Sequence, residues 1–166
     1  MTAWEQIRQA ALTALRGSGV NAVGEYDAQR APRMEKPVLA VGLRRVKTEK
    51  SGLLEYLGEY EDAQRGTVEV YGRRMQVELV LEAYAPRMVG AAGCDELSGE
   101  AAAALCGRLP PGVTVESVEW EQTLWDTRYG AFLRRGSACC SAYFTAEAAQ
   151  EDGAVLTDFV LKGVIG

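Results

Sequence analysis

The stretch Met75–Tyr84, MQVELVLEAY, decides the fold because its side chains alternate in character. The odd positions are apolar, and the even positions are mostly polar. A period of two residues belongs to a strand with one face on a core and the other toward solvent. The stretch therefore predicts a half-buried strand whose Leu79 and Leu81 side chains point into the core.

Upstream of this strand the apolar positions change phase. Val68 and Val70 are apolar at even positions, whereas the following strand is apolar at odd ones. A change of register by one residue turns every side chain to the other face of a sheet. We therefore expect a bulge or a tight turn near residues 72–74, with Gly72 as the natural residue for either. This predicts a long bent, hairpin-like element rather than one straight strand.

Two segments have the three- and four-residue spacing of amphipathic helices. Residues 3–16 follow Thr2, a suitable N-cap, and end at the glycines of residues 17–19. Residues 94–108 are rich in alanine and end before Pro110. The first apolar stripe comprises Trp4, Ile7, Ala11 and Leu15, and the second comprises Cys94, Leu97, Ala101, Ala104, Leu105 and Leu109. The small side chains of the second stripe should let that helix lie close against a sheet.

Further strands are predicted before and after the second helix. Residues 38–43 start abruptly after Pro37 and are apolar on both faces, which is typical of a strand in the middle of a sheet. The remaining predicted strands are residues 20–26, 113–122, 137–146 and 154–164, with a turn at Asp152–Gly153 and an ambiguous segment at residues 53–64.

The order of these elements predicts an α+β fold. Few long helices separate neighbouring strands, which argues against a doubly wound parallel sheet. We expect a mixed, largely antiparallel sheet with the two main helices packed on one face. No internal repeat or linker divides the chain, so residues 1–166 are predicted to form a single domain.

Composition and charge favour an intracellular assembly protein. Hydrophobic residues make up 48% and charged residues 25% of the chain, as in ordinary globular proteins. No apolar stretch approaches the roughly 20 residues that span a bilayer, and the start does not resemble a signal peptide. The net charge of −5 disfavours general nucleic-acid binding. We expect a cytoplasmic protein that binds neither membranes nor specific nucleic-acid sequences.

The charge is also unevenly spread along the chain. Residues 1–50 carry nine basic and five acidic groups, whereas residues 51–100 carry four basic and ten acidic groups. Such asymmetry suits head-to-tail packing of identical copies, although solvated faces alone account for it equally well.

No constellation of residues points to catalysis, a metal or a cofactor. The chain has no histidine, which excludes the usual catalytic triad and most zinc sites. It also has no phosphate-binding glycine motif. The acidic residues Glu116, Glu119 and Glu121 lie near one another, but Glu119 and Glu121 alternate with the apolar Val118 and Trp120, so the group is interpreted as the solvent face of a strand. The four cysteines are interpreted as small buried residues in a reducing compartment, with a disulfide or a reactive thiol as the alternatives.

Two segments have features of a protein interface. Residues 120–129 hold two tryptophans and a tyrosine among charged residues, a composition frequent at interfaces and also found at core anchors. Residues 27–37 form a polar arm with three cations, which is either an assembly arm or a plain loop. The residues predicted to contribute to an assembly interface are Arg30, Arg33, Lys36, Arg73, Arg74, Trp125 and Arg128.

The order of these pieces resembles the tail terminators, the small tail-completion proteins of phages and prophages. The likeness lies in the opening helix, in Glu25–Asp27 before a proline-bearing loop, and in Pro37–Gly42. It continues through Val70–Arg74, Leu81–Pro86, the second helix and the region of Trp125 and Asp126.

This resemblance implies a non-enzymatic structural protein that caps a growing tail as a six-membered ring. It also implies contacts with other tail proteins, assembly in the cytoplasm and a place in the virion. An acidic ring lumen, through which DNA passes without sticking, is expected of such proteins.

Other readings of the sequence stay open. The chain could be another tail or neck assembly protein, or a subunit of a non-viral complex. It could also be a small-molecule binding module, or an unusual enzyme that uses Cys106 or a pair of carboxylates. An exposed thiol of low pKa in a cleft would favour the enzyme, whereas deeply buried cysteines would argue against it.

Replacing Arg30, Arg33 and Lys36 with glutamate is expected to leave the fold intact and to weaken self-association. Light scattering after size exclusion, at matched salt, measures the effect. Unchanged association would contradict an assembly role for the arm.

Overall fold

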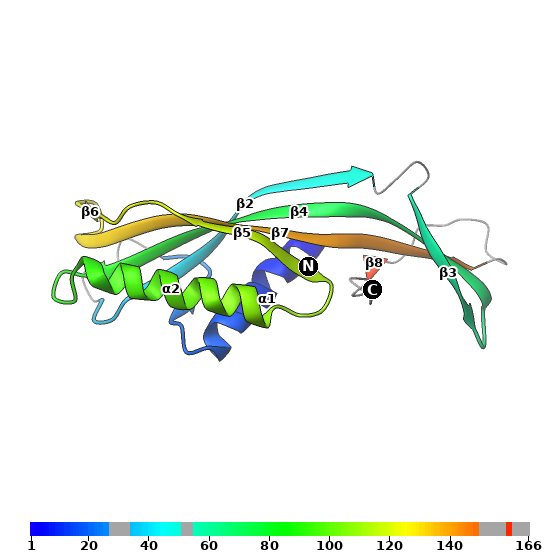
Figure 1. Ribbon diagram of the computed structural model, residues 1–166, viewed down its shortest axis with the longest axis horizontal. Coiled ribbons are helices and arrows are strands. Elements are labelled where there is room, and N and C mark those ends of the chain that lie inside the picture. Colours follow the sequence, from blue (N-terminus) through cyan, green and yellow to red (C-terminus); the bar gives the residue numbers. More distant parts are fainter. Residues whose placement is uncertain (27–33, 51–54, 150–158, 161–166) are drawn as a thin grey trace.

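A twisted sheet with two helices against one of its faces makes up the fold of this computed structural model (Figure 1). The structure describes residues 1–26, 34–50, 55–149 and 159–160. In chain order the elements are α1 (Ala3–Gly17), β1 (Ala22–Val23), β2 (Val38–Lys50), β3 (Tyr56–Asp62), β4 (Gly66–Pro86), α2 (Ala91–Arg108), β5 (Val113–Trp120), β6 (Leu124–Asp126), β7 (Ala131–Ala149) and β8 (Phe159–Val160).

The central path of the sheet runs in the order β1-β2-β4-β7-β5. β1 pairs with β2 in parallel, and every other described pairing is antiparallel, including those of β3 with β4 and of β6 and β8 with β7. Both helices contribute to one core on the same face of the sheet. The predicted α+β fold, with its largely antiparallel sheet and helices on one face, is confirmed.

The alternating stretch, residues 75–84, lies within β4 and supplies its core-facing side chains. Met75, Val77, Leu79, Leu81 and Ala83 expose none of their surface, as their odd positions predict. They face α1 and α2 within the main core.

The predicted bulge or turn near Gly72 is wrong. β4 runs through this region and pairs residue for residue with β7, from Val68 opposite Ala149 to Pro86 opposite Ala131. Val68 is buried too, but an uninterrupted strand places it on the opposite face from Met75. The apolar pattern changes phase because a different face of the strand is covered, and the backbone register stays the same.

The two helices form largely where the sequence predicts them. The Thr2 hydroxyl accepts a hydrogen bond from the Glu5 N–H at 3.4 Å and so caps α1. α2 starts at Ala91, three residues earlier than expected, after Gly90 with a φ of 82°. A Cβ at Gly93 would lie 3.1 Å from the Ala85 Cβ, so this glycine allows a close approach between α2 and β4. The predicted tight packing of α2 is therefore present at its first turn.

The other strands differ from their predicted bounds. β1 is shorter than the predicted strand 20–26, and β7 is longer than the predicted strand 137–146. β2 continues through the polar residues 44–50, and the ambiguous segment 53–64 contains β3. β6 was not predicted. Of the predicted strand 154–164 only β8 lies within the described residues, and the predicted turn at Asp152–Gly153 lies outside them.

A small second cluster covers the other face of the sheet where β2 begins. It consists of buried Val38, Ala40, Tyr84 and Leu133, with Tyr26 and Tyr129 packed against it. The Tyr84 ring lies 4.8 Å from the Tyr26 ring and 4.9 Å from the Tyr129 ring, measured between centroids. Since Leu39 and Val41 face the main core, the start of β2 is buried on both faces, as predicted.

Leu79→Ala and Leu81→Ala should each lower the free energy of unfolding by about 2–5 kcal/mol, because each removes a fully buried side chain. Urea denaturation followed by circular dichroism measures the change. Gln76→Ala, on the opposite face of the same strand, is the matched control and should change stability little. Losses below about 1 kcal/mol at both leucines would contradict the observed register.

Candidate assembly interface

The structure separates the predicted interface residues into two groups, and Arg30 and Arg33 lie outside the described residues. One end of the sheet holds Lys36, Trp125 and Arg128. At this end Tyr84 of β4 pairs with Val38 of β2 on one side and with Leu133 of β7 on the other. Leu133 in turn pairs with Leu124 of β6. The start of β2, β6 and the turn after β6 therefore occupy one end of the sheet.

Arg73 and Arg74 belong to the second group, well away from this end. They lie eleven and ten residues before Tyr84 on β4, or roughly 35 Å along the strand. Arg73 Nη2 forms an ion pair with Glu55 Oε1 at 2.6 Å, and Arg74 forms one with Glu116. These arginines have partners within the chain and do not share a surface with Trp125.

The end around Trp125 exposes an unusual number of large apolar side chains. Met88 is 83% exposed, Val89 41%, Leu124 58% and Trp125 42%. The Arg87 guanidinium lies 5.9 Å from the Trp125 ring and so links the turn after β4 to β6. We call Arg87, Met88, Val89 and Trp125 the Trp125 patch, because Leu124, the neighbour of Trp125 in β6, points to the opposite face of the sheet.

The Trp125 patch is held in place by contacts beneath and beside it. The Trp125 ring meets the Phe132 ring edge to face at a centroid distance of 5.0 Å. In the turn that follows, the Asp126 carboxylate accepts hydrogen bonds from the backbone N–H groups of Arg128 at 2.8 Å and Tyr129 at 3.3 Å. The other tryptophan of this region, Trp120, packs against the main core instead. Of the two tryptophans singled out in the sequence, Trp120 therefore anchors the core, whereas Trp125 is exposed on the surface.

A polar network ties the same end of the sheet to the start of α2. Arg134 Nη1 lies 3.0 Å from Asp95 Oδ1, and Arg134 Nε donates to the Glu121 carbonyl at 2.7 Å. The Thr123 hydroxyl also donates to Asp95, at 2.9 Å. Sequence reasoning missed this network because Asp95 and Arg134 are far apart in the chain and neither belongs to a motif. The contacts fix the connection from which β6 begins.

The cysteines divide by exposure. Cys94 and Cys140 are buried, as predicted, and burial raises their pKa to about 11 and about 12. Cys139 points to the opposite face from Cys140, where burial, followed by the nearby Glu116 carboxylate, raises its pKa. The prediction that all four are buried is wrong for Cys106, which is exposed on α2, and for Cys139, which is only partly buried. Cys106 follows Leu105 directly and so lies beyond the buried stripe of the helix.

The described residues contain no cluster of three or more cysteine, aspartate or glutamate side chains that could hold a metal ion. Glu116, Glu119 and Glu121 are exposed on and just after β5, as predicted for a solvent face. No helix in the described part of the chain has the length and apolar character needed to cross a membrane.

A hollow of about 560 Å³ lies next to the start of β2. Its walls include Val23, Tyr26, Met34 and Val38, together with polar side chains at Asn21, Glu25, Glu35 and Lys36. No protein-family model and no curated protein matches this chain.

The thiol of Cys106 should react first with a disulfide reagent such as DTNB, because it alone is fully accessible among the four. The reaction should accelerate as pH rises, since the thiolate is the reactive form. Cys94 and Cys140 should react only after unfolding, because they are buried and their pKa values are raised. Absorbance at a fixed pH follows the rate. Cys106→Ser should abolish the rapid reaction and Cys139→Ser should preserve it, and the reverse result would contradict the assignment.

Proposed function

We propose that this chain is a non-enzymatic structural component of a phage or prophage tail. The best-supported role is a tail terminator, or tail-completion protein, that closes into a ring at the end of the tail. The observation that carries the proposal is the Trp125 patch, together with the resemblance of the sequence to that family. A patch of this kind is suited to another protein, because it displays large apolar side chains on a turn and a short strand.

The composition of the Trp125 patch supports a protein partner. Tryptophan, methionine and arginine are enriched in protein interfaces, and tryptophan and arginine supply many of their strongest contacts. Within the described part of the chain Arg87 forms no ion pair and lies over the Trp125 ring, so its charge is available to a partner.

The local contacts of Trp125 lower the cost of binding. The edge-to-face contact with Phe132 and the hydrogen-bonded turn at Asp126 already restrict the motion of β6. A partner then has less conformational entropy to remove on docking. A rigid displayed aromatic side chain is therefore a suitable anchor for repeated assembly.

The overall charge is compatible with the proposed ring. A ring at the tail end has DNA passing through it, and a net charge of −5 opposes retention of phosphate groups. Another tail or neck protein of the same fold class would use the same kind of patch on a different partner.

The molar mass in solution tests the proposal. Light scattering after size exclusion over a wide concentration range should find a closed oligomer, with six copies as the expected number. Trp125→Ser should shift the population toward monomer, because it removes the anchor of the patch. Tyr56→Ser is the matched control, since Tyr56 is a similarly exposed aromatic residue on β3, away from the patch. A wild-type chain that stays monomeric at every concentration would contradict ring assembly.

A further inference from the structure

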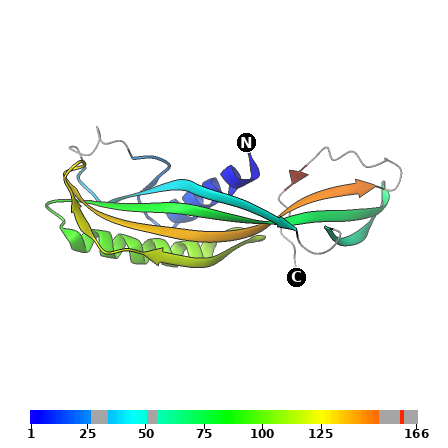
Figure 2. The ribbon, with the colours of Figure 1, turned by 90° about the horizontal axis from the view of Figure 1, so that it is seen from above.

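The two edges of the central sheet carry charges of opposite sign. Figure 2 shows β2 (cyan) along one side of the sheet and β5 (yellow-green) along the other. Among the described residues each is an edge strand, because only one of its sides pairs with a neighbour over the segments considered below. Edge strands present unpaired backbone N–H and C=O groups and are therefore potential sites for pairing with another chain.

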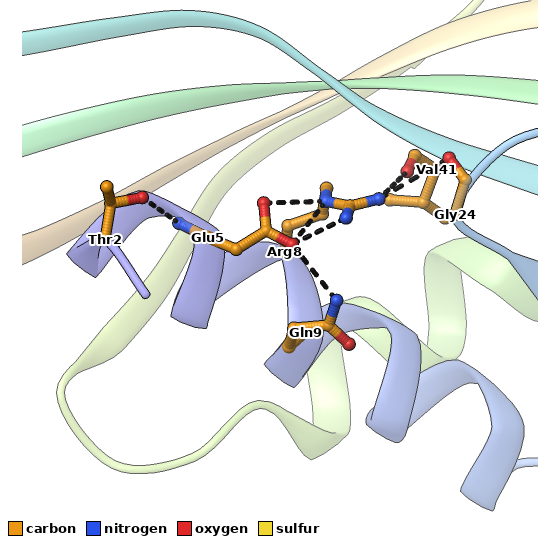
Figure 3. Close-up of polar contacts among 6 residues, drawn as sticks. All are labelled: Thr2, Glu5, Arg8, Gln9, Gly24 and Val41. Atoms are coloured by element: carbon orange, nitrogen blue, oxygen red, sulfur yellow. Dashed lines mark hydrogen bonds and ion pairs between the residues drawn. The ribbon is translucent and has the colours of Figure 1, made fainter.

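Arg8 marks where the free part of the β2 edge begins. β1 pairs with β2 at Leu39 and Ala40. Just beyond, Arg8 Nη1 donates to the carbonyl oxygens of Val41 at 3.3 Å and Gly24 at 3.5 Å (Figure 3). Beyond this point the described part of the chain places no strand beside the outer side of β2.

Glu5 and Gln9 hold the Arg8 guanidinium in the position from which it donates to these two carbonyl oxygens. Arg8 Nε donates to both Glu5 carboxylate oxygens at 3.1 Å, and Gln9 Nε2 donates to Glu5 Oε1 at 3.1 Å (Figure 3). The hydrogen bond from Arg8 lowers the pKa of Glu5, because it favours the ionised form of the carboxyl group. Arg8 is therefore held at the point where the covered start of β2 ends and the free segment begins.

The free segment of β2, residues 43–50, is basic. It carries four cations, Arg44, Arg45, Lys47 and Lys50, and a single acid, Glu49. The side chains of Arg44 and Arg45 are 64% and 75% exposed. Both approach the same carboxylate, Glu78, at 3.4 Å and 3.9 Å, so one acid faces two cations. The β2 edge therefore retains an excess of positive charge.

The β5 edge is acidic. Residues 113–121 contain three glutamates and no cation. Glu119 is exposed and forms no ion pair within the described residues. Glu116 pairs with Arg74, which reaches it from β4 across β7. The surplus charge on this edge is negative.

The free segments of the two edges lie at the same level of the sheet. Following the pairings across the sheet, Thr48 of β2 pairs with Met75, which pairs with Ala142, which pairs with Val113 of β5. Val41 connects in the same way through Leu81 and Gly136 to Trp120. The successive pairings are all antiparallel, so β2 and β5 run in opposite directions. A second copy placed beside the first in the same orientation would bring its β5 antiparallel to β2 and level with it.

We propose that residues 43–50 of β2 in one copy pair with β5 of the next copy. The partner is thus a second copy of this chain, and the proposal rests on the proposed ring assembly. Because the two surfaces differ, the contact is heterologous and propagates around a ring if the rotation between copies closes. Backbone pairing on either side of the irregularities at Arg44 of β2 and Glu116 of β5 would supply the attachment, and the opposite charges would steer and orient it.

The charges on the two edges also prevent incorrect pairing. Two β2 edges would bring like cations together, and two β5 edges would bring like carboxylates together, both of which are unfavourable. Charged side chains on an edge strand usually prevent any edge-to-edge pairing. Here the opposite signs permit one combination, β2 with β5, and oppose the other two.

Charge reversal on each edge tests the proposal. R44E/R45E makes the β2 edge acidic, and E116K/E119K makes the β5 edge basic. Each variant alone should fall to monomer in light scattering, since its two edges then carry the same sign. Mixed in equal amounts, the two variants should recover the wild-type molar mass, because every contact then joins a basic edge to an acidic one. E96K/E100K, on the exposed side of α2, is the matched control for E116K/E119K and should leave the oligomer unchanged.

The outcomes separate this contact from the proposed function. Variants that keep the wild-type oligomer, with circular dichroism showing an intact fold, would overturn the edge contact and leave ring assembly standing. Monomeric variants that fail to recover on mixing would also overturn it. A wild-type chain that is monomeric at every concentration would contradict both the contact and the ring.

Discussion

The backbone ladder between β4 and β7 is the interaction on which the rest of the structure depends. It runs from Val68–Ala149 to Pro86–Ala131 without a shift of register. Because the ladder fixes which side chains face the helices, the apolar residues of β4 and the buried Cys140 of β7 form one continuous core surface. The same ladder carries β6 at one end and sets β2 and β5 at matching levels on its two sides. The pairing of β4 with β7 therefore sets the positions of both proposed contact surfaces, the Trp125 patch and the two sheet edges.

The sequence allowed prediction of those features of the fold that depend on local pattern. The alternation of residues 75–84 and the stripes of the two helices match the buried residues closely, because burial on one face leaves a simple period. The change of phase near Gly72 could not be interpreted correctly in the same way. A bulge and a change in the covered face produce the same pattern of apolar residues, and only the pairing with β7 distinguishes them.

The candidate interface could be predicted only in part, for a related reason. Trp125 was identified because residues 120–129 have an unusual composition, with two tryptophans and a tyrosine among charged residues. Met88 and Val89 belong to the same patch, but they are far from Trp125 in the sequence, and the pairing of β4 with β7 brings them to the same end. Arg73 and Arg74 were grouped with Trp125 on charge alone, and the strand geometry places them elsewhere. Charge identifies residues available for contact, whereas the register decides which of them share a surface.

The strand order shows where the unevenly distributed charges of the chain lie on the sheet. The basic character of the first fifty residues is partly concentrated on the free segment of β2, at Arg44, Arg45, Lys47 and Lys50. The acidic glutamates near residue 119 lie on the opposite edge, across the intervening strands β4 and β7. Solvated faces would require no particular relation between these groups. Opposite signs on two antiparallel edges at the same level are instead the arrangement that a directional copy-to-copy contact needs, because it makes one edge pairing favourable and two unfavourable.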